Sequence, residues 1–351
     1  MTEMMKAAVF TTPGGPEVLE YVEIERPLPG RGEVLVRVRA CGINGFDLLA
    51  RNGRYQTGQA KPHVLGGDVV GSVAGYGPGC EERISVGDNV ALHWVISCGS
   101  CEQCLRGFET TCLRYGYLGA KYPGGYAEYV VVPERNIVAL HDYVDLYKAA
   151  AFPMAFGTSW HMLVTRAQLQ PGETVLVQAV GSGIGVAAIQ IAQLIGARVI
   201  GSAGSDWKLE RAVDMGVAPG DLINYNKNGL YDEVMRITDK RGVDVVFEHI
   251  GGEGFGDAVR SVTRNGRLVT CGGTASYDVS MNIAHVFHKQ VSIIGSNSAT
   301  RWEFEQITDL LRQGRFHPIV DRVFPLHQAA KAHAYLDTRS GFGKVVLSVD
   351  D

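Results

Sequence analysis

The chain has 351 residues, 46% of them hydrophobic, and this length suggests two domains with sizeable cores. Its formal net charge is -4 and no Lys/Arg tract stands out, so nucleic acid and acidic membrane surfaces are not expected partners. The opening MTEMMKAAVF lacks the apolar core of a secretory signal, and no uncharged apolar run is long enough to span a membrane. A cytoplasmic location is therefore expected, with reduced or metal-bound Cys.

The first part of the chain, up to about Ala149, is predicted to be mostly β. Val34, Val36 and Val38 alternate with other residues in the pattern of a half-buried strand, and Gly125 to Val132 predicts another strand after a Gly-Gly turn. The apolar stretch from Ala149 to Val164 then predicts a helix. This change of pattern marks the start of a second domain.

Strand and helix signals alternate after Pro171-Gly172. Six apolar segments form two groups of three, and helical segments separate most of them, which predicts a doubly wound parallel sheet. The chain then continues into two predicted helices and a last apolar strand that is expected to return to the first domain. The six strands are Val175–Val180, Arg198–Ala203, Leu222–Tyr225, Val243–Ile250, Arg267–Gly272 and Val291–Asn297, and the later segments are the helices Trp302–Gln313 and Leu326–Thr338 and the strand Gly343–Val349.

A glycine-rich turn joins the first of these strands to the following helix. Its glycines allow a tight turn and a close approach to a pyrophosphate, which the helix N-terminus would attract. The turn departs from a strict G-x-G-x-x-G because Val180 and Ser182 fill two glycine slots, and such a turn also serves helix–sheet packing alone. Inside a six-strand alternating pattern it predicts dinucleotide binding. The expected contacts are Gly181, Ser182, Gly183, Ile184 and Gly185.

The end of the second strand of the sheet bears on cofactor choice. An acidic residue there would bind a ribose diol and repel a 2′-phosphate, but this chain has Ala203. Ser202, Ser205 and Lys208 would offer donors and one positive charge, and Tyr225 would flank the same phosphate. NADPH is therefore the expected cofactor, with Asp206 as an opposing signal; Lys208 also fits a solvated helix position.

Four Cys lie within fifteen residues, in the pattern Cys98-x-x-Cys101-x-x-Cys104-x7-Cys112. Thiols at this spacing can surround one tetrahedral Zn²⁺. Disulfides are the alternative, but neighbouring pairs so closely spaced would be strained. We expect one structural zinc per subunit. Cys41, Cys80 and Cys271 are expected to be small buried apolar residues.

Together these features resemble the zinc-containing alcohol dehydrogenases of the medium-chain dehydrogenase/reductase superfamily, over essentially the whole chain. The opening Met5-Lys-Ala-Ala-Val, the Gly66 to Gly71 turn, the Cys lobe and Gly343-Lys-Val-Val-Leu carry the resemblance. It implies an α/β architecture. A GroES-like catalytic domain would comprise residues 1–154 and 298–351, with the zinc lobe at about 93–115, and a Rossmann domain would comprise residues 155–297.

The catalytic metal ligands of the zinc members do not carry over. Those members have Cys where this chain has Asn44, His-Glu where it has Gly67-Asp68, and Cys or Asp where it has Met154. Asp68 alone cannot hold a zinc that needs three protein ligands. Ile43 to Asp47 and the segment ending at Tyr55 resemble instead the zinc-free branch of zeta-crystallin-like quinone oxidoreductases and enoyl-thioester reductases, including acryloyl-CoA reductases. Many of that branch lack the Cys lobe, so the chain mixes features of both.

The resemblance implies NADPH-dependent reduction of an enone, quinone or enoyl thioester without a catalytic metal. Tyr55 would stabilise the enolate or protonate the α-carbon, or would only line the site. Asn44 would orient the nicotinamide ribose or a loop, and Asp47 would brace that loop. Two alternatives remain: an alcohol or aldehyde dehydrogenase with an atypical site, and a non-enzymatic NADPH-binding protein. Further cofactor contacts are expected from Thr158, Gly272, Gly295 and Lys344.

Several other residues have two interpretations from sequence. Met154, Phe156, Trp94 and Tyr115 fit either a substrate pocket or the core, and His93 and His249 fit either a functional or a structural role. The apolar strand Val291–Gly295 predicts a homodimer or a dimer of dimers, because a bare sheet edge of this kind would be an association hazard.

Overall fold

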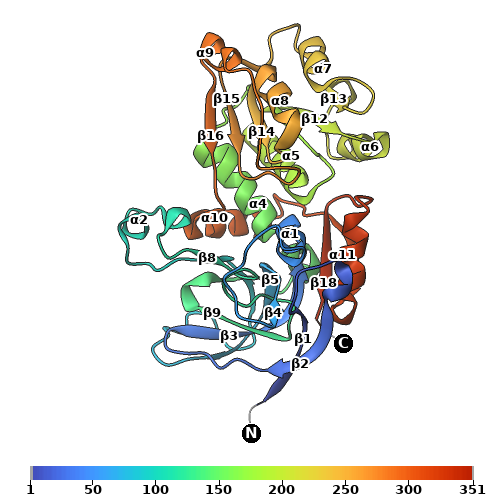
Figure 1. Ribbon diagram of the computed structural model, residues 1–351. Helices are drawn as coiled ribbons and strands as arrows, with labels where there is room; N and C mark the ends of the chain where they lie inside the picture. Colours follow the sequence, from blue (N-terminus) through green and yellow to red (C-terminus); the bar gives the residue numbers. More distant parts are fainter. Residues whose placement is uncertain (1–2, 350–351) are drawn as a thin grey trace. The chain divides into compact units, whose positions relative to one another are not determined.

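The computed structural model describes residues 3–349, which form two compact units (Figure 1). One unit contains the residues up to Gly157 and those from Ala299 onward, and the other contains Thr158–Ser298. The first boundary falls inside helix α4 (Pro153–Trp160). Among the described residues, no helix has the length and apolar character needed to cross a membrane.

The GroES-like unit is built on a seven-stranded sheet in which β10, β6, β5, β3, β18 and β17 are successive neighbours and β9 also pairs with β3. A three-stranded sheet, β2-β1-β4, and the pair β7-β8 complete its β structure. Its strands are β1 (Met4–Phe10), β2 (Glu20–Glu25), β3 (Glu33–Gly42), β4 (His63–Val64), β5 (Asp68–Tyr76), β6 (Asn89–Leu92), β7 (Val95–Ile96), β8 (Gly116–Tyr117), β9 (Tyr129–Pro133), β10 (Ile137–Ala139), β17 (Val320–Pro325) and β18 (Lys344–Ser348). Its helices are α1 (Gly45–Arg51), α2 (Glu102–Leu105), α3 (Leu146–Ala150), α10 (Arg301–Arg312) and α11 (Ala329–Asp337).

The last strand of the chain returns to this unit, as the sequence predicts. Val346 of β18 pairs with Gly42 of β3 in antiparallel register, and β17 adds on the other side of β18 in parallel. Val34, Val36 and Val38 of β3 are all buried. The alternation in the sequence therefore identifies the inward face of this strand.

The Rossmann unit has six parallel strands in the order β13-β12-β11-β14-β15-β16, which confirms the predicted fold class. The sheet order reverses between β11 and β14, and the central strand β11 is buried along its whole length. Its strands are β11 (Thr174–Val177), β12 (Arg198–Ala203), β13 (Leu222–Asn224), β14 (Val243–Glu248), β15 (Val262–Thr270) and β16 (Ser292–Gly295), and its helices are α5 (Gly183–Ile195), α6 (Asp206–Asp214), α7 (Leu230–Ile237), α8 (Phe255–Ser261) and α9 (Ala284–Lys289).

The single helix predicted from Ala149 to Val164 is wrong in detail. The segment contains the end of α3, a break, helix α4 from Pro153, and a π-helical turn at His161–Arg166. Proline cannot continue a helix because it lacks an N–H, but its fixed φ suits the first turn of a new one. Pro153 therefore starts α4 instead of extending α3.

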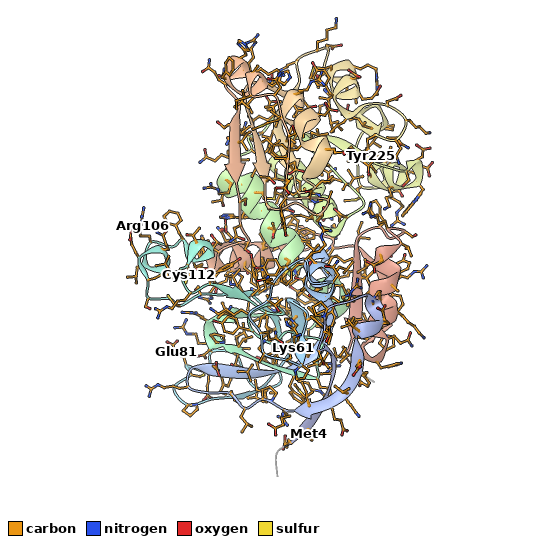
Figure 2. The ribbon with its side chains drawn as sticks, in the orientation of Figure 1. Met4, Lys61, Glu81, Arg106, Cys112 and Tyr225 are labelled. Atoms are coloured by element: carbon orange, nitrogen blue, oxygen red, sulfur yellow. The ribbon has the colours of Figure 1, made fainter. Side chains whose placement is uncertain are left out.

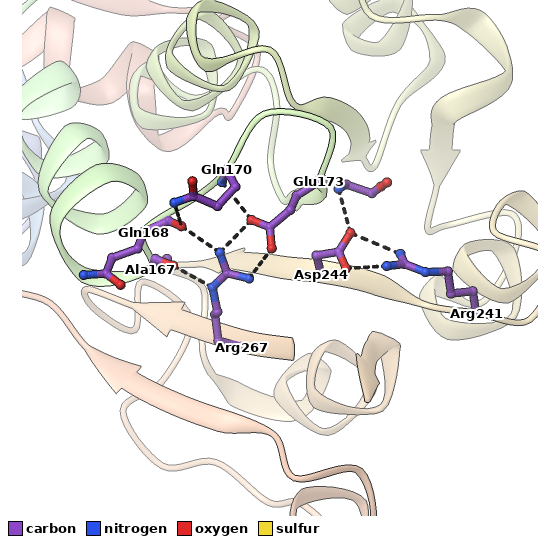
Figure 3. Close-up of polar contacts among 8 residues, drawn as sticks. Ala167, Gln168, Gln170, Glu173, Arg241, Asp244 and Arg267 are labelled. Atoms are coloured by element: carbon purple, nitrogen blue, oxygen red, sulfur yellow. Dashed lines mark hydrogen bonds and ion pairs between the residues drawn. The ribbon is translucent and has the colours of Figure 1, made fainter. Parts of the chain in front are cut away.

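An arginine ties three segments of the Rossmann unit together (Figure 3). Arg267 of β15 forms a bidentate ion pair with Glu173, at 2.7 and 2.6 Å, just before β11. It also donates to the carbonyl oxygens of Ala167 and Gln168, which follow the π-helical turn. Beside it, Arg241 pairs with Asp244, whose carboxylate accepts the Thr174 N–H. These contacts fix the amino-terminal end of the central strand.

Candidate functional site

The turn at the start of α1 is held by a buried carboxylate. The Asn44 backbone N–H donates to Asp47 at 2.7 Å, and the Gly66 N–H donates to the other carboxylate oxygen at 3.0 Å. Asp47 is fully buried, and burial raises its pKa to about 7. The structure therefore places Asp47 as a brace between α1 and the loop at Gly66.

Lys344, Asp68 and Asn44 form a closed triad of side chains. The Lys344 ammonium donates to Asp68 at 2.7 Å and to the Asn44 amide oxygen at 2.6 Å, and the Asn44 amide nitrogen donates to Asp68 at 3.0 Å. The second Asp68 oxygen accepts the Met154 N–H at 2.7 Å, near the start of α4. Asp68 is fully buried and Lys344 is 6% exposed. From the sequence, Lys344 was predicted only to contact the cofactor. Its contacts with Asn44 and Asp68 were not predicted.

The positions that hold zinc in the zinc-containing members do not fit that metal here. A Cβ added to Gly67 would lie 2.2 Å from the methyl carbon of Met154, so the thioether already fills the space of a side chain at position 67. Asn44 offers an amide whose oxygen already accepts from Lys344. Asp68 is the remaining oxygen ligand, and it is engaged in the ion pair. A catalytic zinc needs three protein ligands, which these residues do not supply.

Tyr55 belongs to an aromatic cluster that no local sequence pattern predicts. Its ring lies edge-on to Phe46 at 4.7 Å, Phe46 lies 5.8 Å from Tyr117, and Tyr117 lies 4.6 Å from Tyr115. The Tyr55 backbone N–H donates to Leu49, which anchors the residue just beyond α1. Tyr55 and Tyr115 are both partly exposed, so they form part of an accessible aromatic wall.

Trp94, Phe156 and the two candidate histidines are buried. Trp94 and Phe156 are each 1% exposed and belong to the core. His93 is buried, with Nε2 2.9 Å from the Ala299 carbonyl, and burial lowers its pKa to about 4. Burial likewise lowers the pKa of His249, whose Nε2 lies 3.3 Å from the Gln178 carbonyl. Both histidines are therefore neutral near pH 7.

The glycine-rich turn has the geometry needed for a pyrophosphate. Ser182 caps α5 by accepting the Gly185 N–H at 3.0 Å, while its hydroxyl donates to Ala179 at 2.8 Å. A Cβ on Gly185 would lie 2.4 Å from the Ala179 carbonyl oxygen, so only glycine permits this close packing of helix on strand. Gly183 and Ile184 are partly exposed at the N-terminus of α5, and Gly181 is buried in the turn. Free N–H groups at a helix N-terminus attract phosphate, so the turn fits a dinucleotide.

The residues predicted to surround a 2′-phosphate lie in or near the segments that follow β12 and β13. Ala203 occupies the end of the strand, and Tyr225 is exposed, with its hydroxyl 2.9 Å from where a Gly204 Cβ would stand (Figure 2). Lys208 is partly exposed, with its ammonium 5.3 Å from the centre of the Trp207 ring. Ser202 is 1% exposed and its hydroxyl lies inside the unit, so its role as a phosphate donor stays a prediction.

Asp206, whose negative charge argues against NADPH, is paired with neighbouring side chains. Asp206 pairs with Lys227 at 2.6 Å and accepts a hydrogen bond from Asn224 at 2.7 Å. Its carboxylate is therefore already engaged near the end of β13. The hydrogen bond from Lys227 lowers the pKa of Asp206, so it stays ionised.

The remaining predicted cofactor contacts in the Rossmann unit lie at strand or helix ends. Gly272 follows β15, Gly295 ends β16, and both are exposed. The Gly295 carbonyl accepts a hydrogen bond from Arg166 at 2.9 Å. Thr158 lies on α4 and is partly exposed. Because the strands are parallel, Gly272 and Gly295 share the carboxyl edge of the sheet with the turn before α5, where open α/β sheets bind ligands.

The four predicted zinc ligands come together around α2 (Figure 2, where Cys112 is labelled). The Sγ atoms of Cys98, Cys101, Cys104 and Cys112 all lie within 4.8 Å of one another, with separations of 3.9, 3.5 and 3.8 Å for three of the pairs. Sulfurs about 2.3 Å from a tetrahedral zinc lie about 3.8 Å apart, so the cluster fits this ion. No disulfide joins them.

The lobe also donates hydrogen bonds to these sulfurs. Cys112 accepts the N–H groups of Cys98 and Arg114, each at 3.3 Å, and Cys98 accepts the N–H of Cys101 at 3.3 Å. Hydrogen bonds from the Ser100 backbone and from Arg114 lower the pKa of Cys98 to about 5. Such donors favour thiolates, the form that binds zinc. Arg114 is the residue of this group that the Cys spacing could not reveal.

Comparisons with known proteins match both units. Residues 30–142 match the family of the alcohol dehydrogenase GroES-like domain, and residues 183–313 match the family of the zinc-binding dehydrogenases. The chain is 29% identical to a quinone oxidoreductase of Mus musculus, over 98% of each chain, and 33% identical to an alcohol dehydrogenase of Geobacillus stearothermophilus, over 99% of this chain and 100% of the other. A crystal structure described as an NAD-dependent alcohol dehydrogenase is 42% identical, with a TM-score of 0.94, over 99% of this chain and 100% of that one.

Proposed function

Because this chain belongs to the medium-chain dehydrogenase/reductase superfamily, we propose that it uses NADPH to reduce an activated double bond without a catalytic metal. The family makes it an oxidoreductase. The double bond belongs to an enone, a quinone or an enoyl thioester. The quinone oxidoreductases among its relatives support this class of substrate.

The observation that carries the proposal is the shortage of proton acceptors around Asn44. The carboxylates of Asp47 and Asp68 are both fully buried and already accept hydrogen bonds from within the protein. The Asn44 oxygen accepts from Lys344, so its amide nitrogen is the end that can serve a substrate. Oxidising an alcohol requires a group that takes the hydroxyl proton, and zinc supplies that help in the zinc-containing members. Reducing a conjugated double bond requires donors instead, which suits this site.

Different residues of the chain would bind the cofactor, stabilise the negative charge and supply the proton in that reduction. The turn at Gly181 to Gly185 would hold the pyrophosphate of NADPH, which supplies a hydride to the β-carbon of the substrate when bound. The electron pair of the double bond then moves toward the carbonyl oxygen, where donors stabilise the negative charge. The Tyr55 hydroxyl and the Asn44 amide are the proposed donors, and Tyr55 or water gives the α-carbon its proton. For an enone or an enoyl thioester the products are the saturated carbonyl compound and NADP⁺, and for a quinone they are the hydroquinone and NADP⁺.

A second candidate is an alcohol or aldehyde dehydrogenase of the same superfamily. The structure that is 42% identical is described as an NAD-dependent alcohol dehydrogenase, which favours this alternative for both substrate and cofactor. The two candidates differ in their need for a catalytic metal and in their reaction with simple alcohols. One assay therefore separates them.

The test uses the zinc-loaded protein with NADPH and a panel of 2-cyclohexenone, 1,4-benzoquinone and crotonyl-CoA, and with NADP⁺ or NAD⁺ and primary alcohols. We expect reduction of at least one activated alkene or quinone, unchanged by mild chelation, and no useful alcohol oxidation. Tyr55→Phe should lower kcat about 100-fold if its hydroxyl donates the proton, while Tyr147→Phe, at an exposed residue of α3, should not. Efficient oxidation of a primary alcohol with no reduction of any panel member would refute the proposal. An unchanged rate for Tyr55→Phe would show that Tyr55 only lines the site.

The preference for NADPH is tested at the end of β12. Ala203→Asp should raise the KM for NADPH at least tenfold, because the new carboxylate repels the 2′-phosphate and can bind a ribose diol instead. Lys208→Ala should weaken NADPH binding without affecting NADH. Ala218→Asp, at an exposed position of the same unit, is the matched control. A wild-type kcat/KM for NADH equal to or above that for NADPH would reject the preference.

A further inference from the structure

We propose that Lys344 is a positioning residue whose ammonium fixes the orientation of the Asn44 amide. This inference rests on the function proposed above, because it assigns Asn44 a donor role there. Lys344, Asn44 and Asp68 belong to β18, the start of α1 and β5, three segments far apart in the sequence. Their side chains meet in one closed set of hydrogen bonds.

The chemistry of the partners permits only one orientation of the amide. An ammonium can only donate hydrogen bonds and an ionised carboxylate can only accept them. The Asn44 oxygen must therefore face Lys344, 2.6 Å away, and the nitrogen must face Asp68, 3.0 Å away. An amide nitrogen carries two hydrogens, and the triad uses one of them. The other is held in a fixed direction on a partly exposed residue.

The same contact balances the charge of the site. The Asp68 side chain is fully buried and the Lys344 side chain is 7% exposed, so each ion depends on the other. A buried carboxylate without a partner would be strongly destabilised. Here a single ammonium neutralises a single carboxylate. Lys344 therefore holds the donor geometry without acting as a Lewis acid.

A different role for Lys344 makes a different prediction. As a cofactor contact, the role that the resemblance implies, its loss would weaken NADPH binding and leave the rate at saturation little changed. As a positioning residue, its loss lets the Asn44 amide rotate and lowers the rate at saturation. The two roles therefore separate in kcat and in the dissociation constant for NADPH.

The first experiment compares three variants of the full-length, zinc-loaded protein. Lys344→Met should lower kcat about 10- to 100-fold, the range seen when a residue that orients a site residue is lost, while the Kd for NADPH, measured by fluorescence titration, changes less than about threefold. Lys344→Arg keeps the positive charge and should recover much of kcat. Lys6→Met removes a lysine from an exposed ion pair with Glu23 and is the matched control. A large rise in Kd with kcat unchanged would overturn the proposal.

The second experiment separates positioning from stability. Asp68→Asn and Lys344→Met should each lower the midpoint of thermal unfolding, because each leaves one buried charge without its partner. The double variant should recover much of that midpoint but not kcat, because two neutral side chains no longer dictate the amide orientation. Recovery of kcat together with stability would show a purely structural ion pair and overturn the inference.

Failure of the proposed function would be visible separately. If the wild type reduces no activated alkene or quinone but oxidises an alcohol, the function is refuted, and the Lys344 variants are then assayed on the alcohol. A loss of kcat with unchanged NADPH or NADP⁺ binding still supports the positioning role. An unchanged kcat in Lys344→Met, on whichever substrate the wild type uses, contradicts it.

Discussion

Cys112→Ser is expected to abolish zinc binding and to unfold the lobe around α2. Cys112 is 6% exposed, and its sulfur lies 3.8 Å from that of Cys101. A serine hydroxyl is a poor zinc ligand, and three thiolates would remain clustered without a cation. Structural zinc sites contribute folding free energy directly, so we expect a loss on the order of several kcal/mol in the lobe. The zinc content, measured by metal analysis, should fall from about one ion per chain to near zero. Proteolysis between Cys98 and Cys112 should become faster.

Cys80→Ser provides the matched control for this prediction. Cys80 is partly exposed and its thiol lies against the Glu33 carbonyl, outside the zinc cluster. Its replacement should leave the zinc content unchanged. Two tightly bound zinc ions in the wild type would contradict both the single structural site and the loss of the catalytic ligands. A Cys112→Ser variant that retained a full zinc complement would show that the other three thiolates suffice.

Charged substitutions at the β16 edge are expected to halve the mass of the protein in solution. We propose that the chain forms a homodimer, or a dimer of dimers, through this edge. Strand β16 ends the sheet of the Rossmann unit, and six large apolar side chains in the segment from 277 to 293 are exposed. Exposed apolar patches beside an open sheet edge are typical of protein interfaces. The six residues are Tyr277, Val279, Met281, Ile283, Phe287 and Ile293.

The double substitution Phe287→Lys and Ile293→Lys tests this interface. It places four like charges across a symmetric dimer, a cost of several kcal/mol. Light scattering at micromolar concentration should show twice or four times the chain mass for the wild type and half of that for the variant. Val213→Lys, at an exposed position on α6 of the same unit, should leave the mass unchanged. A monomeric wild type would refute the proposed assembly.

The sheet of the Rossmann unit could be predicted from sequence because its signals are local. Each strand is a short apolar run bounded by turns, and β12 has the predicted limits, Arg198–Ala203. The limits of the strands were harder to predict. β15 begins at Val262, five residues before the predicted Arg267, because Gly266 and its polar neighbours interrupt the apolar pattern at the start of the strand. The break before Pro153 could not be predicted from the apolar stretch alone, because the stretch contains the end of α3 as well as α4.

The candidate site could be predicted only where its residues are neighbours in the sequence. The four Cys of the candidate zinc site lie within fifteen residues, so their spacing alone predicted that they come together. Lys344 and Asn44 are 300 residues apart, and nothing local shows that they touch. The aromatic cluster at Tyr55 and the inward orientation of Ser202 likewise depend on packing between distant segments. The site depends on contacts between residues far apart in the sequence, whereas the fold could be predicted from local patterns.

The pairing of β18 with β3 has a consequence for synthesis of the chain. Gly42 leaves the ribosome 304 residues before its partner Val346. The Rossmann unit is one uninterrupted segment, so all six of its strands emerge while β3 still lacks this neighbour. Domains generally fold as they emerge, and closing so long a loop is slow. The GroES-like unit therefore starts before the Rossmann unit and is completed after it, and the end of β3 at residues 40–42 lacks its neighbour until β18 emerges.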